Sequence, residues 1–168
     1  MSEQSLTRWL RAGRVGRPHG LDGGFHVLEA SATLLTAGAR VLVNGSEVTI
    51  ARRAGDDRRP IVRLEGLEDR AAAEALRGDE LLVERFHAPE LEPDEWWAED
   101  LEGCAVRDGG RPVGVVRRLL ALPSCEVLEV DRGGARADLL VPLVSDAVRE
   151  VDIERREIDV DLRFLGEE

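Results

Sequence analysis

The chain has 168 residues, of which 43% are hydrophobic and 34% are charged. This length suits one domain of ordinary size or two small ones, and the composition is that of a globular chain rather than a disordered one. The net charge of −11 excludes a uniformly basic nucleic-acid-binding protein, while an acidic surface that receives a basic protein remains open.

The charge is unevenly distributed along the chain. Residues 1–90 carry 13 arginines against 14 acids, whereas residues 91–168 carry 10 arginines against 20 acids. Almost all of the net negative charge therefore lies in the second half. A nearly neutral half followed by a strongly acidic half predicts two modules.

The cysteines and the N-terminal sequence indicate a compartment. Cys104 and Cys125 are too few for a disulfide framework or a zinc site, and they do not suggest an oxidising compartment. Residues 1–11 lack the apolar core of a signal peptide, and no apolar run approaches membrane-spanning length. We therefore expect a cytoplasmic protein with no membrane partner, and nothing in the sequence demands more than a monomer.

The first half is typical of a small antiparallel β domain, because short apolar runs recur between Gly, Asp and Pro turns. Asn44 and Gly45 form a dipeptide that favours a hairpin turn. A short helix is expected over residues 70–77, capped by Asp69 and ended by Gly78, and it is short enough to need a sheet to pack on. Strands are predicted at residues 25–28, 41–43, 47–52, 61–64 and 81–83.

The second half begins after a segment that is rich in proline and acids, residues 87–95, which we interpret as a linker. Six further strands in so short a segment favour a small barrel; they are predicted at residues 104–107, 113–120, 126–130, 139–144, 148–153 and 157–162. The sequence thus predicts an all-β protein with one or two short helices and two β-barrels. The expected domains span residues 8–86 and 96–168, with the acidic linker at 87–95.

No motif predicts catalysis or metal binding. The glycine-rich turn at residues 20–24 lacks the ending of a P-loop and opens no helix, so a turn between strands is the better interpretation. His19, His26 and His87 have no zinc-ligand spacing, and no serine or cysteine lies in a nucleophile-elbow context. We expect no catalytic residue, no metal ion and no cofactor.

Arginine clusters are the first positive signal. Four arginines crowd the N-terminal segment and four more crowd the loop near residues 52–59. One interpretation is phosphate contact with RNA; the other is a solvated surface that Asp56 and Asp57 partly balance, and both stay open. The candidate RNA contacts are Arg14, Arg17, Arg52, Arg53, Arg58 and Arg59.

The adjacent pair Trp96 and Trp97 is the second signal. On an extended segment, neighbouring side chains point to opposite faces, so at most one indole can enter a core. The other would be exposed beside acids, as is typical of binding hot spots. The alternative is that the linker folds back and covers it; we favour the binding interpretation and take both residues as candidate partner contacts.

The order of these features resembles that of the ribosome maturation factor RimM family. No single motif is specific, but their order and spacing together are, over about residues 11–166. The family's aromatic pair is usually two tyrosines, so Trp96 and Trp97 keep the stacking area and lose the hydroxyl hydrogen bonds. The matching segments are Gly13-Arg14-Val15-Gly16, His19-Gly20-Leu21-Asp22-Gly23, residues 72–78, residues 100–106, residues 113–116, residues 141–144 and residues 148–152.

The resemblance implies an N-terminal, translation-factor-like six-stranded barrel and a C-terminal PRC barrel. It also implies a non-enzymatic assembly factor that binds the head of the immature small (30S) ribosomal subunit. The expected contacts are small-subunit ribosomal protein nineteen and 16S rRNA, whose processing the factor would promote. Two alternatives remain: a PRC-barrel adaptor for a protein unrelated to ribosomes, and an enzyme that uses the first barrel as some reductases do.

Overall fold

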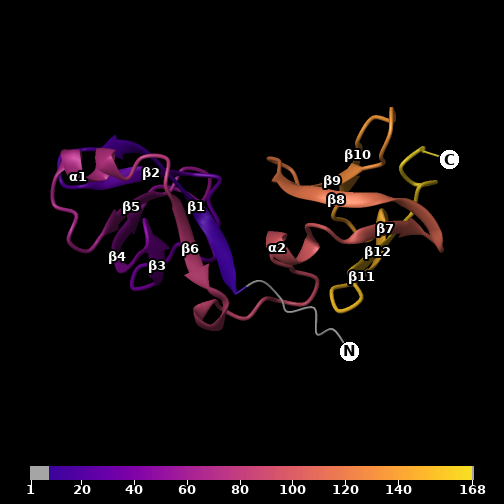
Figure 1. The fold of residues 1–168 in the computed structure, drawn as a ribbon, viewed down its shortest axis with the longest axis horizontal. Coiled ribbons are helices and arrows are strands. Elements are labelled where there is room, and N and C mark those ends of the chain that lie inside the picture. Colours follow the sequence, from indigo (N-terminus) through magenta and orange to yellow (C-terminus); the bar gives the residue numbers. More distant parts are fainter. Residues whose placement is uncertain (1–7, 168) are drawn as a thin grey trace. The chain divides into compact units, whose positions relative to one another are not determined.

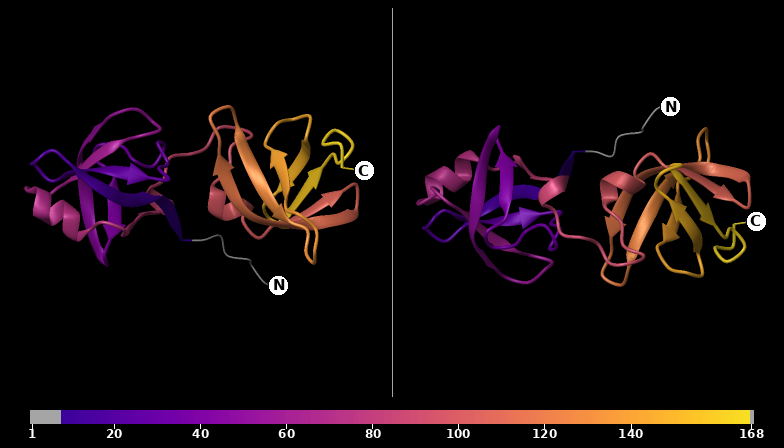
Figure 2. Two further views of the ribbon diagram at one scale, coloured as in Figure 1. Left: turned by 90° about the horizontal axis from the view of Figure 1, so that it is seen from above. Right: turned by 90° about the horizontal axis from the view of Figure 1, so that it is seen from below.

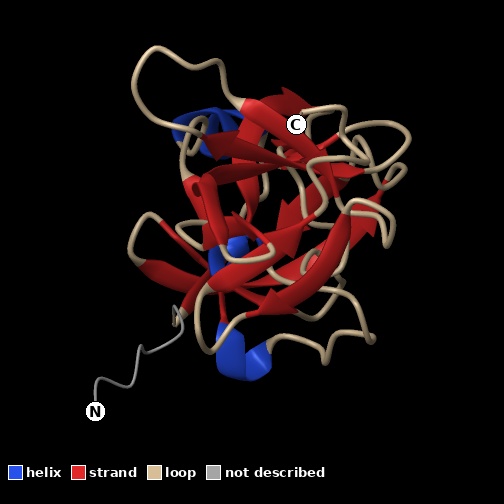
Figure 3. Ribbon diagram, turned by 90° about the vertical axis from the view of Figure 1, so that its right-hand side faces the viewer, coloured by secondary structure: helices blue, strands red, loops and turns tan. Residues whose placement is uncertain are grey.

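The computed structural model describes residues 8–167. Within them the chain divides into two compact units, the first ending at Glu92 and the second beginning at Pro93. Strands make up most of the regular structure in both units (Figures 1 and 3). The expectation of a mostly β protein with two barrel-like sheets is confirmed.

The first unit is a closed barrel (Figure 2). Its strands follow the order β1-β2-β5-β4-β3-β6. All neighbouring strands are antiparallel, and β6 closes the barrel against β1 and β3. Phe25, Ile50 and Leu81 are among the side chains that fill the interior. The strands are β1 (Trp9–His19), β2 (Gly24–Leu28), β3 (Arg40–Val43), β4 (Ser46–Ala54), β5 (Ile61–Leu64) and β6 (Glu80–Glu84).

The first strand, which the sequence pattern does not predict, departs from regular alternation. Arg11, Arg14 and Arg17 are all exposed although they lie three residues apart, and a regular strand would turn Arg14 to the opposite face. The pairing shifts register near Gly13 against β6 and before Pro18 against β2. Such bulges re-aim side chains, and here they bring all three arginines to the outside of the barrel.

A short helix packs on this barrel. Helix α1 (Arg70–Ala75) contacts β1 and β2, and the Asp69 side chain caps it by accepting the Ala72 N–H at 2.8 Å. Gly78 has a left-handed φ of +90°, and its N–H donates to the Val15 carbonyl at 2.8 Å. The predicted cap and stop are both present, although the helix ends two residues early.

The second unit is a six-stranded sheet in the order β10-β9-β8-β7-β12-β11. The pair β7–β12 is parallel and the others are antiparallel. The sheet curls around a core that includes Leu101, Leu128 and Ile158, as a half-barrel (Figure 2). The strands are β7 (Ala105–Asp108), β8 (Arg111–Ala121), β9 (Glu126–Asp131), β10 (Leu139–Pro142), β11 (Val148–Asp152) and β12 (Glu157–Val160).

The segment between β6 and β7 contains two very short helices, a 3-10 turn η1 (Arg85–His87) and α2 (Ala98–Leu101). Residues 88–97 form neither helix nor strand. Across residues 8–167, every helix is too short to cross a membrane.

Gly114 of β8 provides a test of the second sheet. A Cβ atom at this position would lie 2.2 Å from the Asp131 carbonyl oxygen, so the backbone of β8 or β9 would have to move. We expect Gly114→Ala to lower the free energy of unfolding of this unit by about 1–3 kcal/mol or more, measured by urea unfolding. Val115→Ala, which alters a 47% exposed neighbour, is the control, and equal losses in the two variants would contradict the close approach.

Candidate functional site

Basic side chains cover the outer surface of four neighbouring strands in the first barrel, β1, β2, β5 and β4. Register places them together: Arg52 of β4 is paired with Arg63 of β5, and His26 of β2 is paired with Ile61, two residues before Arg63. We call this surface the basic face. Its members are Arg14, Arg17, His19, His26, Arg52, Arg58, Arg59 and Arg63.

The basic face unites the two arginine clusters that are far apart in the sequence. Arg17 from β1 and Arg59 from the β4–β5 loop both act electrostatically on the imidazole of His26. The antiparallel order β1-β2-β5-β4 brings that loop beside β1 and β2. Two arginines of the N-terminal cluster, Arg14 and Arg17, and three of the loop cluster, Arg52, Arg58 and Arg59, therefore belong to one surface.

The β4–β5 loop is held in shape by its own acid. The Asp56 carboxylate accepts the backbone N–H groups of Arg58 at 2.9 Å and Arg59 at 2.8 Å. Gly55 makes the turn with a φ of +76°, and a Cβ there would lie 2.5 Å from the Arg59 carbonyl oxygen. Asp56 thus orders the loop through the backbone while both arginine side chains stay exposed.

Other members of the face have acidic partners. Arg52 contacts Asp22 at 3.1 Å and Arg14 contacts Glu29 at 3.8 Å. The Gly24 N–H and, to a lesser extent, Arg52 lower the pKa of Asp22 below its ordinary value. The alternative interpretation of the arginine clusters, as a solvated surface whose charge is partly balanced by acids, therefore also has support. Such exposed ion pairs contribute little to stability.

Arg53 differs from the other predicted RNA contacts. Its side chain is only 25% exposed and forms an ion pair with Asp57. Its Nε is buried and has no hydrogen-bond partner among the described residues. The structure thus turns Arg53 toward its own loop and leaves it outside the basic face.

The tryptophan pair lies in the second unit, just before α2. Trp96 packs against the core of this unit, whereas the carbonyl of Trp97 accepts the N–H of Asp100 at 3.0 Å and begins the helix. Both side chains are half-buried. Trp96 is the indole that enters the core, and Trp97 is less exposed than an isolated surface indole.

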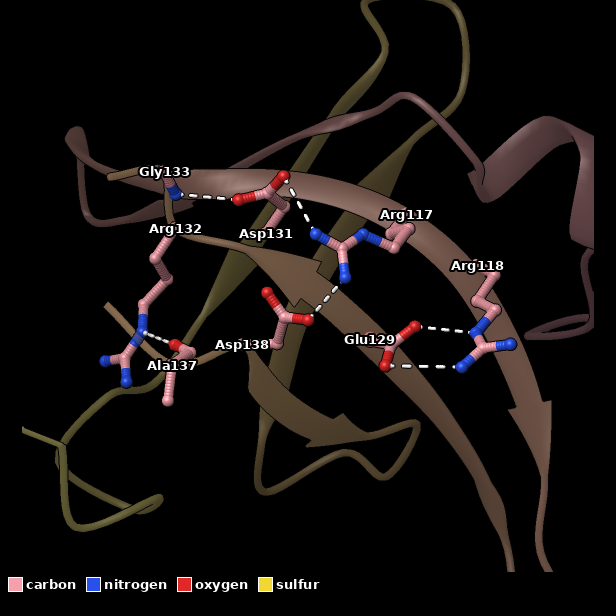
Figure 4. Close-up of polar contacts among 8 residues, drawn as sticks. All are labelled: Arg117, Arg118, Glu129, Asp131, Arg132, Gly133, Ala137 and Asp138. Carbon is pink, nitrogen blue, oxygen red and sulfur yellow. Dashed lines mark hydrogen bonds and ion pairs between the residues drawn. The ribbon is translucent and has the colours of Figure 1, made fainter. Parts of the chain in front are cut away.

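Arginines of the second unit are bound by acids of that unit. On β8, Arg117 contacts Asp131 at 3.1 Å and also pairs with Asp138, and Arg118 contacts Glu129 through both carboxylate oxygens (Figure 4). These pairs link neighbouring strands and neutralise the arginines locally. The surplus of acids in residues 91–168 thus remains as a net negative charge.

A second centre of ion pairing joins β11 to β12. The guanidinium of Arg149 lies 3.0 Å from Asp108, 3.2 Å from Asp159 and 3.4 Å from Asp161, and it donates to the Val160 carbonyl at 2.7 Å. The hydrogen bond to Asp108 is the largest of the interactions that raise the pKa of Arg149. One cation thus offsets part of the repulsion among three carboxylates.

The histidines are the functional candidates that sequence reasoning missed. The sequence pattern places His26 in a strand and gives it no role, yet it lies at the centre of the basic face. Its alternation with Phe25 and Val27, both buried, is the signal that could have placed it outside the barrel. Within residues 8–167, no group of three metal-ligating side chains is found.

Comparisons with known proteins match both units. The RimM N-terminal domain family matches residues 10–88, and the RimM PRC barrel domain family matches residues 98–164. A ribosome maturation factor RimM of Sorangium cellulosum is 38% identical over 161 residues, covering 91% of this chain and 94% of that protein. One of Acidothermus cellulolyticus is 35% identical over 167 residues, covering 95% and 94%.

One solved structure is also similar to part of this chain. The solution structure of the N-terminal domain of RimM from Thermus thermophilus is 32% identical, with a TM-score of 0.45, and the match covers 51% of this chain and 100% of that one.

Two carboxylates of the second unit have lowered pKa values, from which the pH dependence of its stability can be predicted. The Gly133 N–H and Arg117 lower the pKa of Asp131, and the Phe164 N–H and Arg149 lower that of Asp161. As the pH falls, these two carboxylates therefore take up protons in the unfolded chain before they do so in the folded one. The stability that they contribute is fully present well above pH 3.8 and is lost on further acidification.

We expect Asp131→Asn with Asp161→Asn to reduce stability at neutral pH and to flatten its decline below about pH 5. Urea unfolding at a series of pH values measures both effects. Asp146→Asn, in an exposed loop, is the control. A decline as steep in the double variant as in the unaltered protein would show that these two carboxylates do not set the acid response.

Proposed function

Because this chain belongs to the RimM family of ribosome maturation factors, we propose that it binds the head of the immature 30S ribosomal subunit through small-subunit ribosomal protein nineteen and 16S rRNA. In this proposal it is a cytoplasmic monomer that promotes 16S rRNA processing without catalysing a reaction. Residues 8–86 form the RNA-contacting domain, 87–95 the linker and 96–168 the domain that contacts protein.

The basic face is the observation that carries this proposal. Two arginine clusters from distant parts of the sequence converge on adjacent strands around His26. Arginine pairs with phosphate through two N–H groups and suits an RNA backbone better than a point charge does. Contacts of this kind fix position on RNA and do not read its sequence.

The acidic second unit supports contact with a basic ribosomal protein. It carries 19 acids against 10 arginines over residues 93–168, and arginines such as Arg117 and Arg149 are bound by acids of the same unit. A surface of this sign attracts a basic partner and speeds its encounter. An adaptor unrelated to ribosomes could use the same acids, but it would leave the basic face without a ligand.

The arginine contribution is tested with purified 30S subunits. We expect Arg17, Arg52, Arg58 and Arg59 replaced together by Gln to weaken binding. The slope of log affinity against log salt should fall by about 0.7–0.9 for each phosphate that the variant no longer neutralises. Arg53 is left unchanged because its side chain is partly buried.

A charge-matched variant controls for net charge. Arg111, Arg136, Arg155 and Arg163 are exposed in the second unit, and their replacement by Gln should leave the salt slope unchanged. An unaltered slope in the first variant would mean that the basic face does not touch rRNA.

The tryptophans have separable roles. Trp97→Ala should weaken 30S binding by about 2 kcal/mol, as a hot-spot residue does, with the thermal midpoint little changed because the alanine keeps the capping carbonyl. Trp96→Ala should lower the thermal midpoint because Trp96 packs on the core. Co-sedimentation and thermal unfolding measure the two effects, and Trp97→Ala binding as tightly as the unaltered protein would remove Trp97 from the interface.

A further inference from the structure

Two histidines of the first barrel meet on the basic face. The ring centroids of His19 and His26 are 5.0 Å apart, and the rings lie edge to face at 86°. His19 is paired with Gly24 across β1 and β2, so His26 lies two residues further along on the same face. Diagonal neighbours of this kind are within reach of aromatic side chains.

Two arginines lie close to this pair. Arg17 precedes His19 by two residues on β1, and Arg59 approaches from the β4–β5 loop; both charges act on His26. Within residues 8–167, neither guanidinium has a carboxylate within 4.0 Å. The site therefore has an uncompensated positive charge on two sides.

The other neighbours add no free negative charge. Asp22, in the turn between β1 and β2, is engaged by Arg52 at 3.1 Å. Arg70 of α1 donates to the Gly20 carbonyl in the same turn at 3.2 Å. On β5, the residue paired with His26 is the apolar Ile61. In the β4–β5 loop, the Asp56 carboxylate accepts the backbone N–H groups of Arg58 and Arg59, and Asp57 pairs with Arg53. An anion at this site would thus meet cationic groups on β1 and the loop, and each nearby carboxylate is already engaged by another group.

The surroundings of His26 disfavour its charged form in the free protein. Partial burial lowers its pKa below the ordinary value of 6.5, and the charges of His19, Arg17 and Arg59 lower it further. A bound phosphate would offset part of the positive potential at the ring. The protonated imidazole then gains an attractive partner, and both of its nitrogens become donors.

We propose that Arg17, His19, His26 and Arg59 bind a phosphate of an RNA backbone and that this contact takes up a proton. The inference rests on the proposed function, which brings rRNA to the basic face. The arginines supply the permanent charge, while the charged form of His26 is favoured when the phosphate is present. Since the bound state holds more protons, binding is tighter at lower pH, and proton and RNA favour each other reciprocally.

The first test measures 30S binding by the full chain at about pH 6 and pH 8. One proton taken up changes affinity by at most about tenfold per pH unit, so we expect roughly three- to tenfold tighter binding at the lower pH. His19→Gln with His26→Gln should reduce this ratio to about one, whereas Arg59→Gln, which alters only an exposed loop, should weaken binding at both pH values.

Arg40→Gln is the matched control. Arg40 is exposed on β3, which is adjacent to neither β1 nor β2 in the barrel, so the pH ratio should be retained. The same pH ratio in the unaltered protein and in the histidine variant would overturn the inference while leaving the proposed function intact.

A second measurement separates this inference from failure of the proposed function. The imidazole signals of the full chain are followed by NMR over a pH series with and without a uridine hexanucleotide. We expect the hexanucleotide to raise the pKa of His26, while the imidazole signals of His87, on η1, should not move when the hexanucleotide is added. If the chain does not bind 30S subunits, a raised pKa still supports the phosphate site; an unchanged one overturns it.

Discussion

The outer surface of the first barrel depends on the two register shifts in β1. Without them, arginines spaced three residues apart would alternate between the core and solvent. A guanidinium in the interior among Leu10, Phe25 and Leu81 would carry an unpaired buried charge, which is far too costly to retain. The bulges avoid this cost because they turn each arginine outward. The shift before Pro18 also sets the pairing of His19 with Gly24, and so brings His19 close to His26.

Glycine makes these bulges possible at one particular point. A Cβ on Gly16 would lie 2.8 Å from the carbonyl oxygen of His26, so β1 and β2 approach more closely there than another side chain would allow. That approach holds the two strands in the pairing that places Arg17 and His19 beside His26. In the second unit, by contrast, arginines serve as links between strands, as Arg117 does between β8 and β9. Arginines such as Arg59 thus lie exposed on the first unit, whereas Arg117 and Arg149 in the second unit pair with acids of that unit.

Much of the fold follows from local sequence, and the parts that do not have physical causes. Apolar runs and the Asn44-Gly45 turn identify most strands, because their alternation is regular. The sequence pattern does not predict β1, because its bulges break the period of two and because Gly13, Gly16 and Pro18 are typical of loops. The arginine clusters are visible in the sequence, but their union is not, since it depends on the pairing of β2 with β5. Likewise, no local pattern shows that Arg53 turns away from the face, or that Trp96 rather than Trp97 packs on the core.

Engagement of small ribosomal subunits before they are complete is the central role that we assign to this chain. The most direct measurement is sedimentation of the tagged protein with lysate of its own cells through a sucrose gradient, with precursor 16S rRNA measured in each fraction. We predict that the protein migrates with free small subunits that contain precursor rRNA and is absent from assembled ribosomes. Protein that stays at the top of the gradient even at low salt would contradict this role.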